Sequence, residues 1–377
     1  MLRGITWNHT RGLLPMVATA QLFSERNPGV EVVWEKRSLQ EFADASIERL
    51  AERFDLLVID HPWAGHASRR GILLPLDAKL PAGFLDDQRL SQVGRSHDSY
   101  TFDGWQMALA IDAATPVASW RIGSLTAPPR TWEEVIELAR AGQVAIPGLP
   151  IDLLMNFYMV CGAVGEFPFE RPGSVIPRDI GRQALERMRE LAALCDPGIY
   201  AMNPIAVYRH LSDAAGPACY CPFAYGYSNY ARAGYAPHRL AFGDLVTLNG
   251  RRLASTLGGT GLAIAASSRQ QDWAVRYAQF VAEPEIQRTV YTAAGGQPGH
   301  RSAWLDAGNN AASGDYFSAT LPALDRAFLR PRYHGHMHFQ DHAGDPLRDF
   351  LRDGGDPEAV LKRFDQLYAE SLAGPRL

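Results

Sequence analysis

Aromatic and polar side chains gather where the predicted strands of this chain end, a combination that suits the recognition of a small polar ring. Aromatic faces can stack on the C–H surface of a sugar, and fixed polar groups can hydrogen-bond its hydroxyls. The candidate residues at these strand ends are Trp7, His9, Ser38, Asp60, His61, Trp63, Tyr225, Tyr227 and Asn229. A lone aromatic residue at such a position is more often part of a core, where Phe223 is assigned, but the gathering as a whole favours a ligand cleft.

A glycine cluster adds two further candidates, Gly259 and Thr260. Backbone N–H groups in such a cluster can cradle a phosphate. The pattern beginning at Gly258 lacks both the Lys-Ser/Thr pair of a P-loop and the third glycine of the dinucleotide fingerprint. It therefore favours a hinge beside the ligand over a phosphate site.

Polar residues also concentrate in the segment 295–301, which follows a predicted helix. A plain turn explains its glycines and proline, but it does not explain three long polar side chains so close together. These three, expected to face the ligand, are Gln297, His300 and Arg301. A simple turn is the alternative interpretation.

Four of the eleven histidines lie in the segment 334–342. If that segment were extended, His334, His336 and His338 would share one face, as the ligands of a zinc site can. No carboxylate or cysteine completes the set at an obvious spacing, so neither a metal nor a cofactor is predicted. The segment is instead expected to form a loop over the ligand. The residues before it that are expected to contact the ligand are Arg332 and Tyr333.

Catalytic motifs are not apparent. The sequence has no Gly-x-Ser-x-Gly elbow, no His-Glu-x-x-His helix and no cysteine in a distinctive setting. Asp60 and His61 are neighbours, and neighbouring side chains at a strand end usually diverge, so a catalytic dyad is a weak interpretation. A binding protein is favoured, and the alternative is a cytoplasmic enzyme or a ligand sensor on the same scaffold.

Length and composition set the frame for this site. A chain of 377 residues suits two domains of ordinary size. The net charge of -4 is too close to neutral to indicate nucleic acid or an anionic membrane as the main partner. No apolar run approaches the roughly 20 residues of a membrane helix. The four cysteines, interpreted as small buried side chains that favour a reducing compartment, are Cys161, Cys195, Cys219 and Cys221.

The first hundred residues alternate between predicted strands and helices. Strands are predicted over 2–7, 30–34 and 55–60, with a helix over 13–26 and a second helix opened by a Ser-x-x-Glu capping box at Ser38. This order predicts a doubly wound parallel sheet, and such sheets bind ligands beyond the carboxyl ends of their strands. The candidates from Trp7 to Trp63 all lie at those ends.

A second alternating region follows a mixed stretch over 101–120 that would suit a crossing between lobes. Its predicted features are a capping box at Thr131, a strand over 144–146, an apolar helix over 151–161, a helix capped by Asp179, a helix begun by Asn203 and Pro204, and a strand over 218–221. An apolar strand follows the glycine cluster, and the chain is predicted to be mainly helical from Ser268 onward.

These landmarks together resemble the extracellular solute-binding proteins of ABC importers, in the carbohydrate-type family that includes maltose binders. Residues 23–32 look like the family's F-x-x-x-x-P-G-V-x-V opening, and 54–60 resemble its hydrophobic-Asp-hydrophobic third strand. Residues 71–77 resemble G-x-L-x-P-L-D, and 257–264 resemble the return hinge G-G-x-x-L-A-I. Residues 273–287 look like the A-x-x-F-x-x-x-P-E-x-Q helix pair.

The resemblance implies an α/β fold with two lobes, of the periplasmic-binding-protein type II or venus-flytrap class, with a hinge and a helical C-terminal segment. Lobe 1 is expected over 1–109 and again over 259–325, lobe 2 over 110–258, and C-terminal packing helices over 326–377. It implies a monomer that captures a sugar-like ligand for an ABC permease. The family normally carries an export signal, and none is visible here. The expected location is therefore cytoplasmic if the sequence is complete, and periplasmic or extracellular if a leader was removed.

Overall fold

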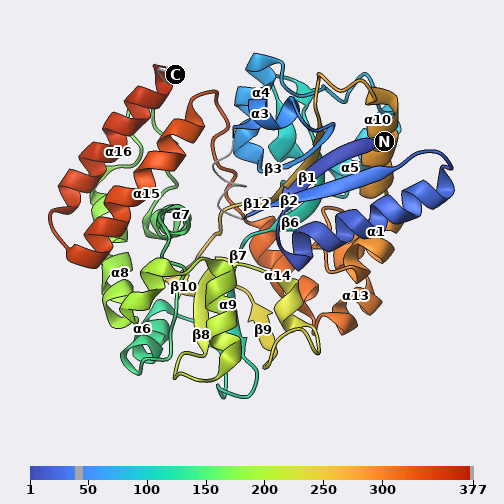
Figure 1. Cartoon of the computed structure of the whole chain (residues 1–377). Coiled ribbons are helices and arrows are strands. Elements are labelled where there is room, and N and C mark those ends of the chain that lie inside the picture. The colour runs from blue at the N-terminus through green and yellow to red at the C-terminus, as the bar shows by residue number, and fades with distance from the viewer. Residues whose placement is uncertain (39–45, 374–377) are drawn as a thin grey trace. The chain divides into compact units, whose positions relative to one another are not determined.

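The computed structural model describes residues 1–38 and 46–373 (Figure 1). The chain forms two compact units, each built from three separate stretches of sequence. Unit 1 comprises Met1–Ala114, Leu257–Leu321 and Arg332–His334. Unit 2 comprises Thr115–Thr256, Pro322–Pro331 and Gly335–Leu377. The chain therefore passes from one unit to the other at several points along its length.

Unit 1 is built on a five-stranded sheet with the order β2-β1-β3-β12-β6. The strands are β1 (Leu2–Trp7), β2 (Val32–Arg37), β3 (Leu56–Ile59), β6 (Leu109–Ala114) and β12 (Gly258–Ile264). Both β2 and β3 pair with β1 in parallel, while β12 runs antiparallel between β3 and β6. Every residue of β3 is buried, as a strand covered on both faces requires. The predicted doubly wound core of parallel strands is confirmed.

Helices pack on this sheet through narrow apolar stripes. Phe23 of α1 (Thr10–Arg26) meets Tyr277 of α10 (Gln271–Ala282) edge to face, with ring centroids 5.2 Å apart. The Thr19 hydroxyl lies 3.0 Å from the Tyr277 hydroxyl within the same buried contact. The other elements of unit 1 are α3 (Ile47–Ala51), α4 (Ala64–Arg70), α5 (Ala82–Leu90), β4 (Thr101–Phe102), β5 (Trp105–Gln106), α11 (Pro284–Ile286), α12 (Arg301–Trp304), α13 (Ala307–Ala312) and the first part of α14 (Tyr316–Asp325).

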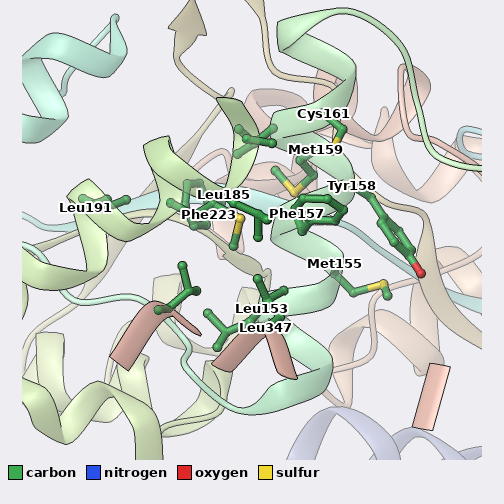
Figure 2. Close-up of a cluster of buried hydrophobic side chains, with 14 of the residues drawn as sticks. Leu153, Met155, Phe157, Tyr158, Met159, Cys161, Leu185, Leu191, Phe223 and Leu347 are labelled. Atoms are coloured by element: carbon green, nitrogen blue, oxygen red, sulfur yellow. The ribbon is translucent and has the colours of Figure 1, made fainter. Parts of the chain in front are cut away.

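Unit 2 surrounds one helix that is apolar on nearly every side (Figure 2). This helix, α7 (Pro150–Val164), presents Leu153 and Phe157 to a core that includes Leu185, Leu347 and Phe223. A helix that is hydrophobic all round must be covered all round. The elements that contact α7 are α8 (Arg178–Leu194), α15 (His336–Asp353), β10 (Thr247–Leu248) and β11 (Arg251–Arg252). Phe364 of α16 (Pro357–Leu372) meets Phe157 edge to face, and α6 (Trp132–Arg140) packs on α8.

A three-stranded antiparallel sheet with the order β8-β7-β9 completes unit 2. Its strands are β7 (Pro116–Arg121), β8 (Tyr220–Tyr225) and β9 (Leu240–Gly243), and α9 (Pro204–Asp213) packs on all three. The observed β8 extends four residues beyond the predicted strand, so Phe223 lies in a strand and in the core, as its assignment to the core required. None of the described helices is both long and apolar enough to cross a bilayer.

Local capping signals are largely confirmed. Thr131 and Glu134 form the predicted capping box, with both reciprocal hydrogen bonds at 3.3 Å. Asn203 caps α9 by accepting a hydrogen bond from the Ala206 N–H at 2.9 Å. Asp179 does not cap α8, because the helix begins one residue earlier, and its carboxylate instead lies in the first turn. Most of the capping box predicted at Ser38 lies outside the described residues.

Two predicted segments have different structures. The histidine-rich segment is not an extended loop, since α15 begins at His336 and continues through it. Phe339, Ala343 and Leu347 are buried at four-residue steps in that helix, and this helical apolar stripe overrides the turn-like composition. The strand predicted over 144–146 is reduced to a single bridge between Val144 and Tyr220. All four cysteines are buried, as predicted, and unbridged.

The buried carboxyl of Asp152 makes the stability of unit 2 depend on pH. Burial raises the pKa of Asp152 in α7 to about 8, while an unfolded aspartate has a pKa of about 3.9. Between these values the folded chain holds a proton that the unfolded chain has released. This one group should therefore lower the free energy of unfolding by about 1.4 kcal/mol per pH unit as the pH rises from about 5 to about 8.

Urea unfolding of the parent protein and of Asp152→Asn across this pH range tests the expectation. The difference in stability between the two should shift steadily in favour of the variant as the pH rises. Asp213→Asn, which removes an exposed carboxylate at the end of α9, should show no such trend. A constant difference between the parent and Asp152→Asn would contradict the assignment.

Candidate functional site

The register of the unit 1 sheet gathers several predicted site residues along one edge. Trp7 pairs with Arg37 at the carboxyl ends of β1 and β2, and Gly261 of β12 pairs with Ile59 near the end of β3. Thr260 pairs with Asp112 near the end of β6. The carboxyl ends of β1, β2, β3 and β6 therefore meet the amino end of β12, and we refer to this line as the carboxyl edge.

A buried ion pair forms the base of the carboxyl edge. The Arg11 guanidinium in the first turn of α1 donates to both carboxylate oxygens of Asp112, with an Nε–Oδ2 distance of 2.8 Å. Both side chains are almost completely buried. Burial raises the pKa of Asp112, and both Arg11 and a backbone N–H from Gln297 act against that rise. The two-point contact gives each buried charge a partner in a fixed geometry.

Trp7 lies beneath this pair and belongs to the core of unit 1, with 3% of its surface exposed. The Arg11 guanidinium carbon is 6.0 Å from the centre of its ring. A Cβ atom at Gly12 would lie 2.3 Å from the indole, so only glycine lets α1 approach the ring this closely. Trp7 thus supports the carboxyl edge from below.

His9 occupies the turn between β1 and α1 and caps the helix. Its Nδ1 accepts a hydrogen bond from the Arg11 N–H at 3.0 Å. Nδ1 must therefore be unprotonated, and the neutral imidazole carries its proton on Nε2. Since His9 is half-buried, this tautomer can present an N–H donor at the carboxyl edge.

The turn after β3 brings Asp60 and His61 together, where the sequence had suggested divergence. Asp60 Oδ1 accepts from the His61 N–H at 2.8 Å and lies 3.2 Å from His61 Nδ1. His61 is fully buried and packs edge to face on Tyr100, with centroids 6.3 Å apart. Asp60 keeps 28% of its side chain exposed, so it is the member of the pair that can meet a ligand.

Trp63 is only half-buried and stands at the end of this turn. It packs edge to face on His66, with centroids 5.7 Å apart. His66 in turn stacks flat on His334, at 4.9 Å and 5°, and its Nε2 lies 2.5 Å from Glu48 Oε1. Burial and the neighbouring His66 lower the pKa of His334. The indole of Trp63 is therefore held from behind while part of its ring stays open.

The segment Arg332–His334 is anchored beside Trp63. Arg332 Nη1 donates to the carbonyl oxygens of Asp98, Ser99 and Thr101 at 2.7–2.9 Å. Because its guanidinium donates to these three carbonyl oxygens, Arg332 fixes the position of the segment Arg332–His334. Tyr333, the next residue, is half-buried.

Thr260 has the only side chain that the glycine cluster adds to the carboxyl edge. It is 5% exposed, and within the described residues its buried hydroxyl has no hydrogen-bond partner. Gly259 adopts a φ of +99°, and a Cβ there would lie 2.3 Å from the Asp112 carbonyl oxygen. The glycine therefore allows β12 to lie against β6, and Thr260 follows with a hydroxyl still able to bond.

The loop 295–301 holds three predicted site residues, and the structure places them in two different surroundings. Gln297 is buried beside β6, where its Nε2 donates to the Ala113 carbonyl at 3.2 Å. His300 lies further along, with Nε2 3.3 Å from Asp87 Oδ2, and burial lowers its pKa. Arg301 Nε donates to the Gln92 carbonyl at 3.1 Å. The structure thus holds Gln297 near Asp112 but anchors His300 on α5 and Arg301 on the segment that follows it.

Unit 2 contributes the aromatic residues that follow β8. Tyr225 is half-buried, and its hydroxyl lies 3.1 Å from the Thr256 hydroxyl. Tyr227 and Asn229 are 5% and 2% exposed. Tyr227 packs edge to face on Tyr208, with centroids 6.2 Å apart. Tyr225 is therefore the ring with exposed surface, and Tyr227 belongs to an aromatic cluster.

Ser38 and the histidine-rich segment complete the inventory. Ser38 is exposed at the end of β2, next to residues that the structure does not describe. Across residues 1–38 and 46–373, no three His, Cys, Asp or Glu side chains are arranged to hold a metal ion. His338 lies 3.2 Å from Glu370, and its ring is 4.6 Å from that of His342 one turn along α15.

Three important residues escaped the sequence reasoning. Arg11 lies two residues before the predicted helix 13–26, and the observed α1 includes it only because that helix begins earlier, at Thr10. His66 follows the predicted turn without a motif of its own. Asp112 offered the clearest signal, because a carboxylate inside the apolar run of β6 needs a buried partner. Within unit 1, the carboxyl edge places the partly open ring of Trp63 with fixed hydroxyl, carboxylate and N–H groups, a combination suited to binding a small polar ligand.

No protein-family model matches this chain, and no curated protein sequence is significantly similar to it. Solved structures do match it over almost their full length. The maltose-bound MalE3 protein of T. maritima is 19% identical, with a TM-score of 0.82 over 98% of this chain and 99% of that one.

Two further structures give the same result. An ABC transporter solute-binding protein of Agrobacterium radiobacter in complex with ribitol is 17% identical, with a TM-score of 0.81 over 98% of both chains. The maltotriose-binding protein of Thermus thermophilus is 17% identical, with a TM-score of 0.79 over 99% of this chain and 100% of that one. The chain therefore has the two-lobed α/β fold of the maltose-binding type, and the predicted fold class is confirmed.

The Arg11–Asp112 pair should be essential to the stability of unit 1. Arg11→Met would leave the Asp112 carboxylate buried without its counter-charge, which is expected to lower the free energy of unfolding by about 3–5 kcal/mol. The double variant Arg11→Met/Asp112→Asn removes both charges and should regain much of that loss. Urea unfolding of the single and double variants measures the coupling.

A matched control is the exposed pair Arg3–Glu35, whose charged atoms are 2.6 Å apart. Arg3→Met should lower stability by less than about 1 kcal/mol, since solvent screens exposed pairs. Equal losses for Arg3→Met and Arg11→Met would show that the buried pair has no special weight.

Proposed function

We propose that this chain binds a small, uncharged, sugar-like ligand, a carbohydrate or a polyol, as the solute-binding component of an ABC importer. The observation that carries the proposal is the match of nearly the whole chain to proteins solved with maltose, ribitol and maltotriose. The carboxyl edge supports it independently, because it offers groups that can hydrogen-bond a ligand hydroxyl and, beside them, a partly exposed aromatic ring.

Each unit would supply part of the binding surface. In unit 1, Trp63 would stack on the ligand, while Asp60, His9 and Thr260 would hydrogen-bond its hydroxyls. In unit 2, Tyr225 would supply a second ring. Eight predicted contacts stay proposals of lower rank, because the structure buries them or anchors them elsewhere: Trp7, His61, Tyr227, Asn229, Gln297, His300, Arg301 and Arg332. Ser38, Gly259 and Tyr333 also stay proposals.

Capture by two units would follow from contacts that form only when both units touch the ligand. A ligand of this kind binds a closed arrangement of the units more tightly than an open one, and it stabilises the closed arrangement by that difference in binding free energy. The permease would then recognise the ligand-bound form of a monomer. Gly258 and Gly259 lie just after one of the points where the chain passes between the units, and we propose that this passage acts as a hinge.

Catalysis is the second candidate, and one observation favours it. A carboxylate beside an imidazole, as in Asp60 and His61, is how many enzymes orient a catalytic histidine. The buried position of His61 argues against it, because a general base must reach the proton that it removes. Binding without turnover is therefore the better-supported function.

Replacing Trp63 should separate a ligand platform from a core residue. Trp63→Ala is expected to lower affinity by about 1–3 kcal/mol, which is roughly 5- to 150-fold in Kd, with only a modest change in stability. Tyr227→Ala should instead lower the free energy of unfolding by about 3–5 kcal/mol, because it empties an aromatic cluster. Calorimetric titration against maltose, ribitol and related sugars, followed by thermal unfolding, measures both effects.

Trp105→Ala serves as the control, since Trp105 is 49% exposed on β5 and should leave the affinity unchanged. Failure of every sugar and polyol to bind the parent protein would contradict the proposed ligand class. Consumption of a bound sugar by the protein alone, followed by mass spectrometry, would contradict the binding function and favour the enzyme.

A further inference from the structure

A hollow lies entirely within unit 2, and the proposed function does not use it. Its volume is about 340 Å³, within the range of small-molecule sites. Its floor is the sheet face formed by Ala118, Trp120 and Gly243, and one wall is the segment 128–130. Pro128 and Pro129 make that wall apolar and stiff, because each proline ring fixes its own backbone angle.

The floor is shaped around the indole of Trp120. Ala118 pairs with Gly243 across β7 and β9, and residues two apart on a strand face the same side. A Cβ atom at Gly243 would lie 3.2 Å from the Trp120 ring, so the ring lies over the bare glycine backbone. Trp120 is half-buried, and it lines the hollow with the part of its surface that remains.

The opposite wall carries charges that are already paired. Asp244 Oδ1 accepts from the Leu245 N–H at 2.8 Å and contacts Arg326 Nη2 at 2.5 Å. Arg252 lies 3.8 Å from the other carboxylate oxygen and donates to the Leu245 carbonyl. The Asp244 carboxylate on this wall is therefore already paired with two arginines.

Arg130 differs from the other cations around the hollow. Its backbone is fixed, because its carbonyl accepts from the Thr247 N–H at 2.9 Å and its N–H donates to Glu134 Oε2 at 2.5 Å. No described residue forms an ion pair or a side-chain hydrogen bond with its guanidinium. A fixed backbone that carries an unpaired, exposed guanidinium at the mouth of an apolar hollow is suited to an anion.

The hollow is separate from the residues proposed to bind sugar. Pro116 of β7 pairs with Tyr225, and Trp120 pairs with Tyr220 at the other end of the same ladder. Four residues of extended strand span roughly 13 Å. A ligand in the hollow would therefore not touch Tyr225.

We propose that this hollow binds a small ring compound that carries an oxyanion group, either a carboxylate or a phosphate. The ring would stack on Trp120 and lie against Pro128 and Pro129, and Arg130 would pair with the oxyanion through two parallel N–H donors. Asp244 is already paired with two arginines, so the guanidinium of Arg130 favours an anion over a neutral ring. This site goes beyond the proposed function, since it needs neither a sugar nor unit 1.

Benzoate, phenyl phosphate and benzyl alcohol are suitable probes, because they share a ring and differ in charge. Ligand-observed NMR titration of the full chain should show one saturable site for benzoate or phenyl phosphate, with benzyl alcohol at least about tenfold weaker. The stronger of the two anions identifies the preferred oxyanion. Maltose or ribitol at saturation should not displace either one.

Arg130→Gln and Trp120→Ala should each weaken anion binding at least about tenfold. Trp120→Phe keeps a ring and should retain most of the affinity, which guards against a loss caused by misfolding. Arg251→Gln is the matched control, since it removes a nearby exposed cation of β11 that does not line the hollow. The proposal is overturned if none of the probes saturates, if benzyl alcohol binds as well as the anions, or if Arg251→Gln weakens binding as much as Arg130→Gln.

Discussion

The buried ion pair between Arg11 and Asp112 is the constraint on which the proposed sugar site of unit 1 rests. It joins side chains 101 residues apart in the sequence, and it sets the first turn of α1 against the end of β6. Two charges removed from water need a nearly ideal mutual geometry to offset the loss of hydration. The surrounding structure meets that demand through Gly12, which admits Trp7 beneath the pair, and through Gln297, which holds the neighbouring backbone.

The aromatic residues near the strand ends are of two kinds: some are buried and support their neighbours, and others keep part of the ring exposed. Trp7 and Tyr227 are nearly fully buried; Trp7 packs against Gly12, and Tyr227 packs against Tyr208. Trp63 and Tyr225 keep part of each ring open while a polar or aromatic neighbour holds the other part. A ring can act as a stacking platform only if its orientation is fixed before the ligand arrives, since otherwise binding must also order the side chain.

Local signals in the sequence were sufficient to predict the secondary structure and the parallel strands, but not the arrangement of the site residues. The parallel strands, the Thr131 capping box and the Asn203 cap depend on neighbours in sequence, and all were predictable. The separation of Gln297 from His300 was not, because it depends on how the loop runs along β6. The segment through His338 forms a helix and not the predicted loop, because the apolar stripe of Phe339, Ala343 and Leu347 outweighs the turn-like composition around it.

The crossing segment Arg332–His334 shows why the position of Trp63 could not be read from its own surroundings. A Cβ at Gly65 would lie 1.7 Å from the Arg332 carbonyl oxygen, so α4 can receive this segment only because it begins with small residues. Once the segment is seated, His334 stacks on His66 and His66 braces Trp63. The orientation of one candidate platform thus depends on a residue about 270 positions later in the chain, held by three backbone carbonyls that accept from a single arginine nitrogen. Those carbonyls belong to the short 3-10 helix Asp98–Tyr100 and to the first residue of β4. A change in this segment would therefore reach Trp63 through Arg332 and the two histidines, without any substitution among the residues proposed to touch a ligand.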